Sequence, residues 1–193
     1  MSLEEVEAKY RACSLCSVAD YRLDEVSLQF VGNPKATYMV IGEAPVLDEE
    51  EGGGLLSGVY GKMLRAAFRA ASLSFDEVFY TTLIGCRSTN SPGGKDFDIS
   101  GTQVRNCNSR VYAMLLEVKP RAVICIGNKV YREFSKVISP SFFTLSFGKV
   151  CVLQVSNLSD MLRIEGTENQ ASALKKLSSE IAVARELIRR EAW

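Results

Sequence analysis

The sequence contains no histidine. That absence excludes zinc sites that mix cysteine with histidine, and it removes imidazole from any scheme of acid–base catalysis. The chain also has no run of 18 apolar residues, and it does not open on a basic segment followed by an apolar one. Neither a membrane-spanning helix nor a secretory signal is therefore expected, and we predict a cytoplasmic protein with no membrane partner.

The chain has no excess of charge of either sign, because 23 lysines and arginines balance 23 aspartates and glutamates. Contacts to nucleic-acid phosphates want a basic surface, so this balance does not favour a nucleic-acid partner, although a local basic patch would be enough for one. The length of 193 residues suits one compact core. We expect residues 1–193 to form a single domain and the protein to be a monomer.

Six cysteines are present, and in a cytoplasmic protein they are expected to be ligands or buried thiols rather than disulfides. Cys125 and Cys151 each lie within an apolar run and are interpreted as small buried residues. The other four form a C-x2-C pair near the N-terminus and flank a long polar loop. These four are Cys13, Cys16, Cys86 and Cys107. Four thiolates are the usual ligand set of an iron–sulfur cluster or a structural zinc ion, and both remain open on the residues alone.

Expected strands alternate with amphipathic helices along the chain. Apolar, β-branched and aromatic runs predict strands over 36–42, 77–84 and 121–127, and a hairpin over 142–155 that turns at Gly148. Helical spacing of apolar residues predicts helices over 3–12, 59–71, 102–118, 128–137 and 171–188. The alternation predicts an α/β fold with a central, mainly parallel four-stranded sheet flanked by helices on both faces. In such sheets, ligands bind beyond the carboxyl ends of the strands.

Several short motifs occur at or near those strand ends. The C-x2-C pair is followed by Gly42-Glu43-Ala44-Pro45, by Cys86-Arg87 and by Met161-Leu162-Arg163. Together, and in this order along nearly the whole chain, they resemble the iron–sulfur, family 4 branch of the uracil-DNA glycosylase superfamily. The resemblance implies the three-layer fold of that superfamily, DNA as a partner, and hydrolysis of the N-glycosidic bond of a base turned out of the DNA. It also favours a [4Fe–4S] cluster over zinc, held by the four cysteines.

The resemblance assigns roles to the loops at the strand ends. It implies carboxylates that position water or stabilise the sugar cation, and an amide that stabilises the departing base. The candidate catalytic residues are Glu43, Asp48, Glu49 and Asn157. The candidate base-binding residues are Ala44, Pro45, Leu56 and Thr82. The candidate DNA-binding residues are Leu158, Ser159 and Arg163, in a loop expected to insert beside the turned-out base.

Three positions depart from the family pattern. Leu56 replaces a phenylalanine that stacks on uracil, Thr82 an asparagine that reads the uracil edge, and Asn157 a histidine that stabilises charge on the base. Leucine has no π-face, and threonine offers one hydroxyl in place of a paired donor and acceptor. Asparagine can still donate to an oxyanion. These departures favour a changed substrate, such as a pyrimidine with a bulkier C5 group, or a lost reaction. The alternative function is a catalytically inactive DNA-binding or protein-interaction module of a replication or repair complex.

The polar loop and its surroundings leave further alternatives open. The interval between Cys86 and Cys107 exceeds the family pattern, so residues 91–100 are expected to bulge from the loop. The acidic stretch 48–51 is either part of the base pocket or a solvated loop. The nearby basic side chains are either phosphate contacts or an ordinary solvated face. They are Lys62, Arg65, Arg69, Arg87 and Lys95.

Overall fold

The computed structural model is described for residues 1–22, 29–137, 144–157 and 167–190. The helices are α1 (Leu3–Arg11), α2 (Leu47–Glu51), α3 (Val59–Ala70), α4 (Gly101–Val118), α5 (Asn128–Val137) and α7 (Thr167–Arg190), with short 3-10 helices η1 (Ser17–Tyr21) and η2 (Phe75–Glu77). The strands are β1 (Phe30–Gly32), β2 (Tyr38–Gly42), β3 (Val78–Thr82), β4 (Ala122–Ile126), β5 (Thr144–Leu145), β6 (Gly148–Lys149) and β7 (Cys151–Val155). None of these helices is both long and apolar enough to cross a membrane.

The central sheet has five strands in the order β1-β3-β2-β4-β7. Strands β3, β2, β4 and β7 run parallel, and β1 pairs antiparallel with β3 at one edge. The prediction of a mainly parallel sheet is confirmed, and β1 is an addition to it. Because β1 has only three residues, it is too short to show the alternating pattern from which strands are predicted.

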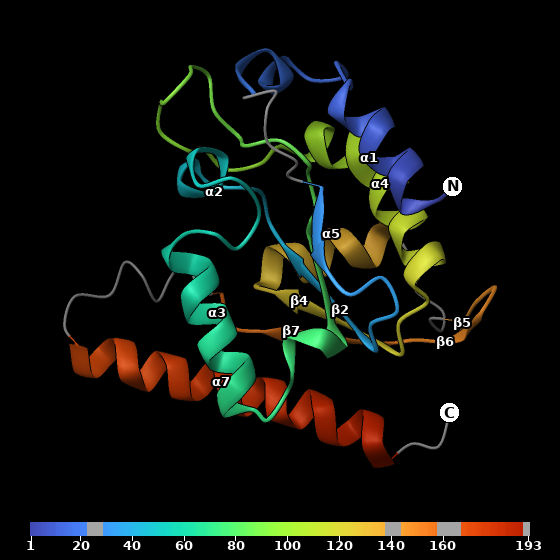
Figure 1. Ribbon diagram of the computed structural model, residues 1–193, viewed down its shortest axis with the longest axis vertical. Coiled ribbons are helices and arrows are strands. Elements are labelled where there is room, and N and C mark those ends of the chain that lie inside the picture. The colour runs from blue at the N-terminus through green and yellow to red at the C-terminus, as the bar shows by residue number, and fades with distance from the viewer. Residues whose placement is uncertain (23–28, 138–143, 158–166, 191–193) are drawn as a thin grey trace.

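Helices cover both faces of this sheet (Figure 1). Alternate strand residues point to opposite faces, so Tyr38 and Val40 pack in the core beneath α3 and α7, whereas Met39 and Ile41 pack in the core beneath α1, α4 and α5. The same alternation holds along β3 and β4, and nearly every side chain of these strands is buried. Strands buried on both faces have nearly continuous apolar sequences, which is why they were predictable.

Local sequence sets the limits of α4, the helix that follows the long polar loop. Ser100 accepts a hydrogen bond from the Gln103 backbone, and the Gln103 side chain accepts one from the Ser100 backbone, so a capping box begins the helix. Lys119 ends it in a left-handed conformation (φ 52°), and Pro120 follows. Cys107 is thereby fixed two turns into a rigid helix rather than on the loop.

The predicted hairpin over 142–155 is only partly correct. Strands β5 and β6 form a small hairpin, but Cys151–Val155 leaves it and joins the central sheet parallel to β4. Residues 142 and 143 lie outside the described part of the chain. Cys125 is fully buried, as predicted, whereas Cys151 is only half-buried, because β7 is the edge strand of the described sheet.

Candidate functional site

A pocket of about 370 Å³ lies at the carboxyl ends of the central strands. Its wall combines the loop after β2, the start of α5, Asn157 after β7, and the polar loop between β3 and α4. The lining residues are Glu43, Ala44, Pro45, Val46, Ser88, Asp96, Phe97, Asp98, Ile99, Lys129 and Asn157. The structure therefore brings the candidate residues Glu43, Ala44, Pro45 and Asn157 together at the sheet edge where ligands of parallel sheets bind.

A second, smaller cavity adjoins this pocket. Its volume is about 30 Å³, and it shares Glu43 and Asn157 with the pocket while adding Glu49, Tyr60 and Tyr80. A cavity needs a volume of roughly 10–15 Å³, together with polar partners, to hold one water molecule. The cavity is therefore large enough and polar enough to hold water directly behind the pocket.

Glu49 forms the buried wall of the small cavity. Its side chain is 1% exposed and accepts hydrogen bonds from the backbone N–H groups of Val46, at 3.1 Å, and Leu56, at 2.7 Å. Burial raises the pKa of Glu49, and these two N–H donors only partly oppose the rise. A buried carboxyl with a raised pKa beside a cleft is suited to exchange a proton with water.

Glu43 forms an ion pair with Lys129, which lies in the first turn of α5. Lys129 Nζ lies 2.8 Å from Glu43 Oε1 and 3.9 Å from Asp98 Oδ1. Lys129 is a pocket residue that was not predicted from the sequence. Its position two residues after Gly127, at the end of a predicted buried strand, was the available signal.

Gly127 allows Asn157 to approach the end of β4. Gly127 has a φ of +92°, and a Cβ atom at this position would lie 3.2 Å from the Cβ of Asn157. A larger residue would be strained by its backbone conformation and crowded by this contact. The Asn157 side chain thus lies at the boundary between the pocket and the small cavity.

Three candidate residues do not line either cavity. Thr82 is fully buried, and its hydroxyl donates a 2.7 Å hydrogen bond to the carbonyl of Ile84. Leu56 is 3% exposed and packs in the core beneath α3 and α7, and Asp48 lies exposed on α2. A strand-end residue was expected to point towards the ligand, but a local hydrogen bond turns the threonine hydroxyl back onto the chain. The candidates Leu158, Ser159 and Arg163 lie outside the described residues.

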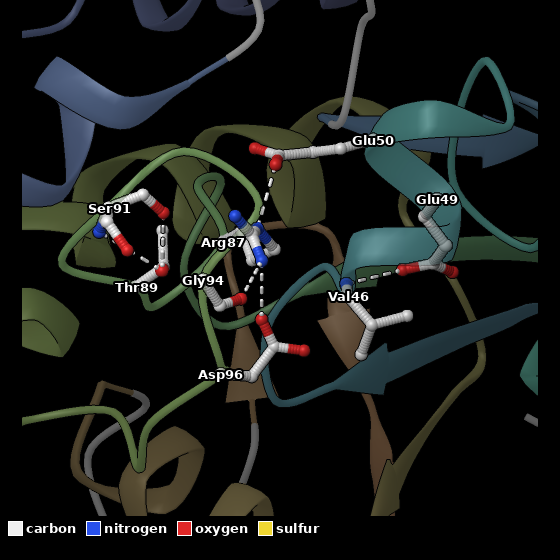
Figure 2. Close-up of polar contacts among 8 residues, drawn as sticks. All are labelled: Val46, Glu49, Glu50, Arg87, Thr89, Ser91, Gly94 and Asp96. Carbon is white, nitrogen blue, oxygen red and sulfur yellow. Dashed lines mark hydrogen bonds and ion pairs between the residues drawn. The ribbon is translucent and has the colours of Figure 1, made fainter.

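Arg87 is buried, contrary to both interpretations of it as a phosphate contact or a solvated side chain. Its side chain is 1% exposed; its Nε donates to Glu50 Oε2 at 2.8 Å, and its Nη1 donates to the Gly94 carbonyl at 2.8 Å and to Asp96 Oδ1 at 3.1 Å. Figure 2 shows this arginine between α2 and the polar loop. Most of residues 91–100 are exposed, as expected of a bulge from the loop, while Arg87 holds part of this segment against α2 and other members of it line the pocket.

The four candidate cysteines line a single small cavity in another part of the molecule. Cys13 and Cys16 come from the segment between α1 and η1, Cys86 from the turn after β3, and Cys107 from α4. Within the described ranges, no three cysteine, aspartate or glutamate side chains are placed to hold a metal ion. The structure thus brings the four sulfurs to one cavity wall without arranging them as a preset ligand group.

Cationic and amide groups surround this cysteine cavity. Asn106 Nδ2 donates to Cys16 Sγ at 3.3 Å, and Arg22 Nη1 lies 3.8 Å from Cys86 Sγ. Burial raises the pKa of the Cys86 thiol, and the positive charge of Arg22 opposes that rise. Donors and positive charges directed at sulfur suit thiolate ligands, so this donor set fits an iron–sulfur cluster.

Arg110 adds a second charge beside the same cavity. It is fully buried on α4, donates to the backbone carbonyls of Gln29 and Thr82, and interacts electrostatically with Cys86 and Cys107. Its Nε has no hydrogen-bond partner among the described atoms. A buried arginine next to two thiols is stabilised when those thiols are ionised. Asn106 and Arg110 were recognisable from their spacing of −1 and +3 around Cys107 on a predicted helix.

Sequence comparison agrees with this architecture. A family model described as the uracil DNA glycosylase superfamily matches residues 30–179. This range includes the whole central sheet, the pocket and two of the four cysteines. The chain therefore belongs to the uracil DNA glycosylase superfamily, which confirms the resemblance seen in its motifs.

Within that superfamily, the chain is similar to proteins named type-4 uracil-DNA glycosylase. It is 24% identical to that of Archaeoglobus fulgidus over 173 residues, which cover 90% of this chain and 83% of the relative. It is 27% identical to that of Sulfurisphaera tokodaii over 146 residues, covering 75% of this chain and 63% of the relative. It is 30% identical to that of Saccharolobus solfataricus over 127 residues, covering 65% of this chain and 56% of the relative.

Proposed function

We propose that this chain is an iron–sulfur protein that binds DNA and hydrolyses the N-glycosidic bond of a base extruded into the 370 Å³ pocket. The observation that carries the proposal is the adjacency of two cavities. Glu43 and Asn157 line both the pocket and the water-sized cavity backed by Glu49. Glycosidic hydrolysis needs such a pair, one space for the base and one for the attacking water.

The chemistry follows from the functional groups at this boundary. The bond between the sugar C1′ and the base nitrogen breaks, and its electron pair leaves with the base. The oxygen of water forms the new bond to C1′, and a carboxylate, Glu43 or Glu49, accepts the proton. Asn157 donates a hydrogen bond to the negative charge that develops on an oxygen of the base. Lys129 is a positioning residue that fixes the orientation of the Glu43 carboxylate.

The substrate base is proposed to differ from simple uracil. The Thr82 hydroxyl donates its hydrogen bond to the Ile84 carbonyl, and Leu56 packs in the core. Neither side chain is therefore available at the pocket wall. The chain thus lacks both the asparagine that would read the uracil edge and the phenylalanine that would stack on uracil. The space left by the phenylalanine favours a modified pyrimidine with a larger C5 substituent.

The four cysteines are proposed to hold a [4Fe–4S] cluster in preference to zinc. The shared cavity, the Asn106 and Arg22 contacts to sulfur and the buried Arg110 support this assignment. When bound, the cluster supplies a rigid cross-link between the N-terminal segment, the end of β3 and α4. No step of the hydrolysis depends on it.

The test is a panel of oligonucleotides that carry uracil, 5-hydroxymethyluracil or another modified base, incubated with protein purified without oxygen and then treated with alkali. We expect strand cleavage at one modified base, and a drop of at least 100-fold in rate for Asn157→Ala, the size typical of removing one oxyanion donor. Glu186→Gln is the matched control, because Glu186 is an exposed residue of α7 that pairs with Arg190 in its own helix. Cleavage that is unchanged in Asn157→Ala would disprove the assigned role.

A second candidate function is a catalytically inactive DNA-binding or protein-interaction module of a replication or repair complex. It is favoured by the withdrawal of Leu56 and Thr82 from the pocket wall. DNA binding without cleavage of any base in the panel would favour this candidate over the glycosylase.

A further inference from the structure

Phe97 is an exposed aromatic residue on the wall of the pocket. Its side chain is 53% exposed, and it is the only aromatic ring among the residues that line the 370 Å³ pocket in the described structure. Exposure of a phenylalanine to water is unfavourable by roughly 1.5–3 kcal/mol relative to burial. A ring held in this way at the mouth of a cavity offers a flat apolar face to whatever enters.

The backbone at Phe97 and in the segment before it is anchored. Its N–H donates a 2.7 Å hydrogen bond to the carbonyl of Ser88, and the Ser88 hydroxyl accepts a hydrogen bond from Gln103 on α4. The preceding residue, Asp96, is bound to the buried Arg87, which also holds the carbonyl of Gly94 (Figure 2). The ring is therefore carried by a fixed segment and not by a loose loop tip.

The other described residues that line the pocket offer no stacking surface. Glu43, Ser88, Asp98 and Asn157 offer hydrogen-bond donors or acceptors, and Lys129 offers a charge. Bases outside a duplex are held by stacking on aromatic rings as well as by hydrogen bonds to their edges. Among the described residues that line the pocket, only Phe97 provides a ring for stacking.

We propose that Phe97 is the stacking platform for the extruded base in this protein, and thus a residue that determines its specificity. This inference rests on the proposed function and extends it: the ligand of the pocket is a planar nucleobase that lies against the Phe97 ring. The platform comes from the loop between β3 and α4, not from the loop that contains the buried Leu56.

The test compares two DNA duplexes that differ only at one position. One carries the most strongly bound base of the oligonucleotide panel on a 2′-fluoro sugar, which resists hydrolysis, and the other carries a tetrahydrofuran abasic site. Removal of one base-stacking ring typically weakens binding by about 5- to 150-fold. We expect Phe97→Ala to weaken binding of the base-containing duplex within that range, and to leave binding of the abasic duplex within about twofold.

Two further variants make the result specific to the ring. Phe97→Tyr keeps the π-face and is expected to retain affinity within about threefold. Tyr112→Ala removes another exposed aromatic residue, 39% exposed on α4 and absent from the pocket wall, and is expected to change neither affinity. Equal weakening of both duplexes by Phe97→Ala, or no weakening, would overturn the platform while leaving the proposed function intact. Failure of the wild-type protein to bind either duplex would instead disprove the proposed function itself, and the platform with it.

Discussion

At the scale of single residues, the guanidinium of Arg87 connects the acidic helix α2 to the loop that lines the pocket. Its partner Glu50 is 2% exposed, so both charges lie outside bulk water. Burial raises the pKa of Glu50, and the neighbouring Arg87 opposes that rise. A buried pair of this kind is weak evidence for stability, but loss of one partner leaves a buried charge without compensation.

We predict that Arg87→Met lowers the free energy of unfolding by about 3–5 kcal/mol, because Glu50 then remains buried and unpaired. The double variant Arg87→Met/Glu50→Leu should recover most of that loss, since neither charge remains. Urea denaturation followed by circular dichroism measures both. If the single variant costs less than about 1 kcal/mol, or the double variant is no more stable than the single one, the pair does not act as a coupled unit.

The buried carboxyl of Glu49 predicts a dependence of stability on pH. Its pKa in the folded protein is raised above 4.5, the ordinary value of a glutamate, so the folded state binds the proton more tightly than the unfolded state does. The resulting stabilisation is fully present below pH 4.5 and is lost as the pH rises through the raised folded value. Above it, ionised Glu49 destabilises the fold.

Glu49→Gln removes this titration. We therefore expect the variant to gain stability relative to the wild type as the pH rises from 4.5 towards neutrality, whatever constant cost the altered hydrogen bonds impose. Urea unfolding of both proteins across that range measures the difference, and other titrating groups cancel in it. Parallel stability curves for the two proteins would show that the Glu49 carboxyl titrates normally.

At the scale of secondary-structure elements, α3 and the loop before it fit together through Gly61. A Cβ atom at Gly61 would collide with the backbone carbonyl of Leu56. Leu56 itself has a φ of +62°, a left-handed conformation that few leucines adopt. With this backbone, Leu56 packs its side chain into the core and does not line the pocket.

We predict that Gly61→Ala destabilises the fold by about 1–3 kcal/mol, because the new methyl group collides with backbone that cannot move aside. Gly101→Ala is the matched control, since its Cβ would meet only the end of Arg105 at 3.4 Å. Alanine is the better helix former by about 1 kcal/mol, so this control should be neutral or stabilising. Thermal unfolding compares them, and equal melting temperatures would contradict the tight contact at Gly61.

The predictability of the elements from sequence depends on how their residues are buried. Strands β2, β3 and β4 are buried on both faces, and their continuous apolar runs predicted both their places and the pocket edge of the sheet. No sequence pattern predicts the direction of a polar side chain at a strand end. Thr82 was therefore expected at the pocket wall, whereas its hydroxyl donates to the Ile84 carbonyl. Phe97 and Arg87 belong to an irregular loop whose path depends on contacts with α2, over 35 residues earlier in the chain. Such long-range contacts leave no periodic trace in a sequence.

At the scale of the whole molecule, one segment of the chain, from β3 to α4, contributes residues to both the cysteine cavity and the pocket. The segment from β3 to α4 carries Cys86 at its start and Cys107 beyond its end, and it lines the pocket in between with Ser88 and Phe97. The N-terminal segment reaches the same region through Tyr10, whose hydroxyl lies 2.6 Å from the Ser109 hydroxyl on α4. A cross-link among the cysteines would therefore brace the segment that forms the pocket.

We predict that Cys13→Ala abolishes the visible absorption and lowers the iron and sulfide content of anaerobically purified protein, and that it also lowers the melting temperature. Cys125→Ala is the control, because this fully buried cysteine lies on β4 and lines neither cavity. It should keep the colour. Unchanged iron content in Cys13→Ala, or equal loss of iron in both variants, would exclude Cys13 as a ligand.

Cys86 and Arg87 are neighbours in the chain. One peptide bond therefore separates a proposed ligand of the inorganic centre from the arginine that holds the segment before Phe97. Loss of the proposed centre would release Cys86, and that change lies one residue away from the Arg87 contacts to Glu50, Gly94 and Asp96.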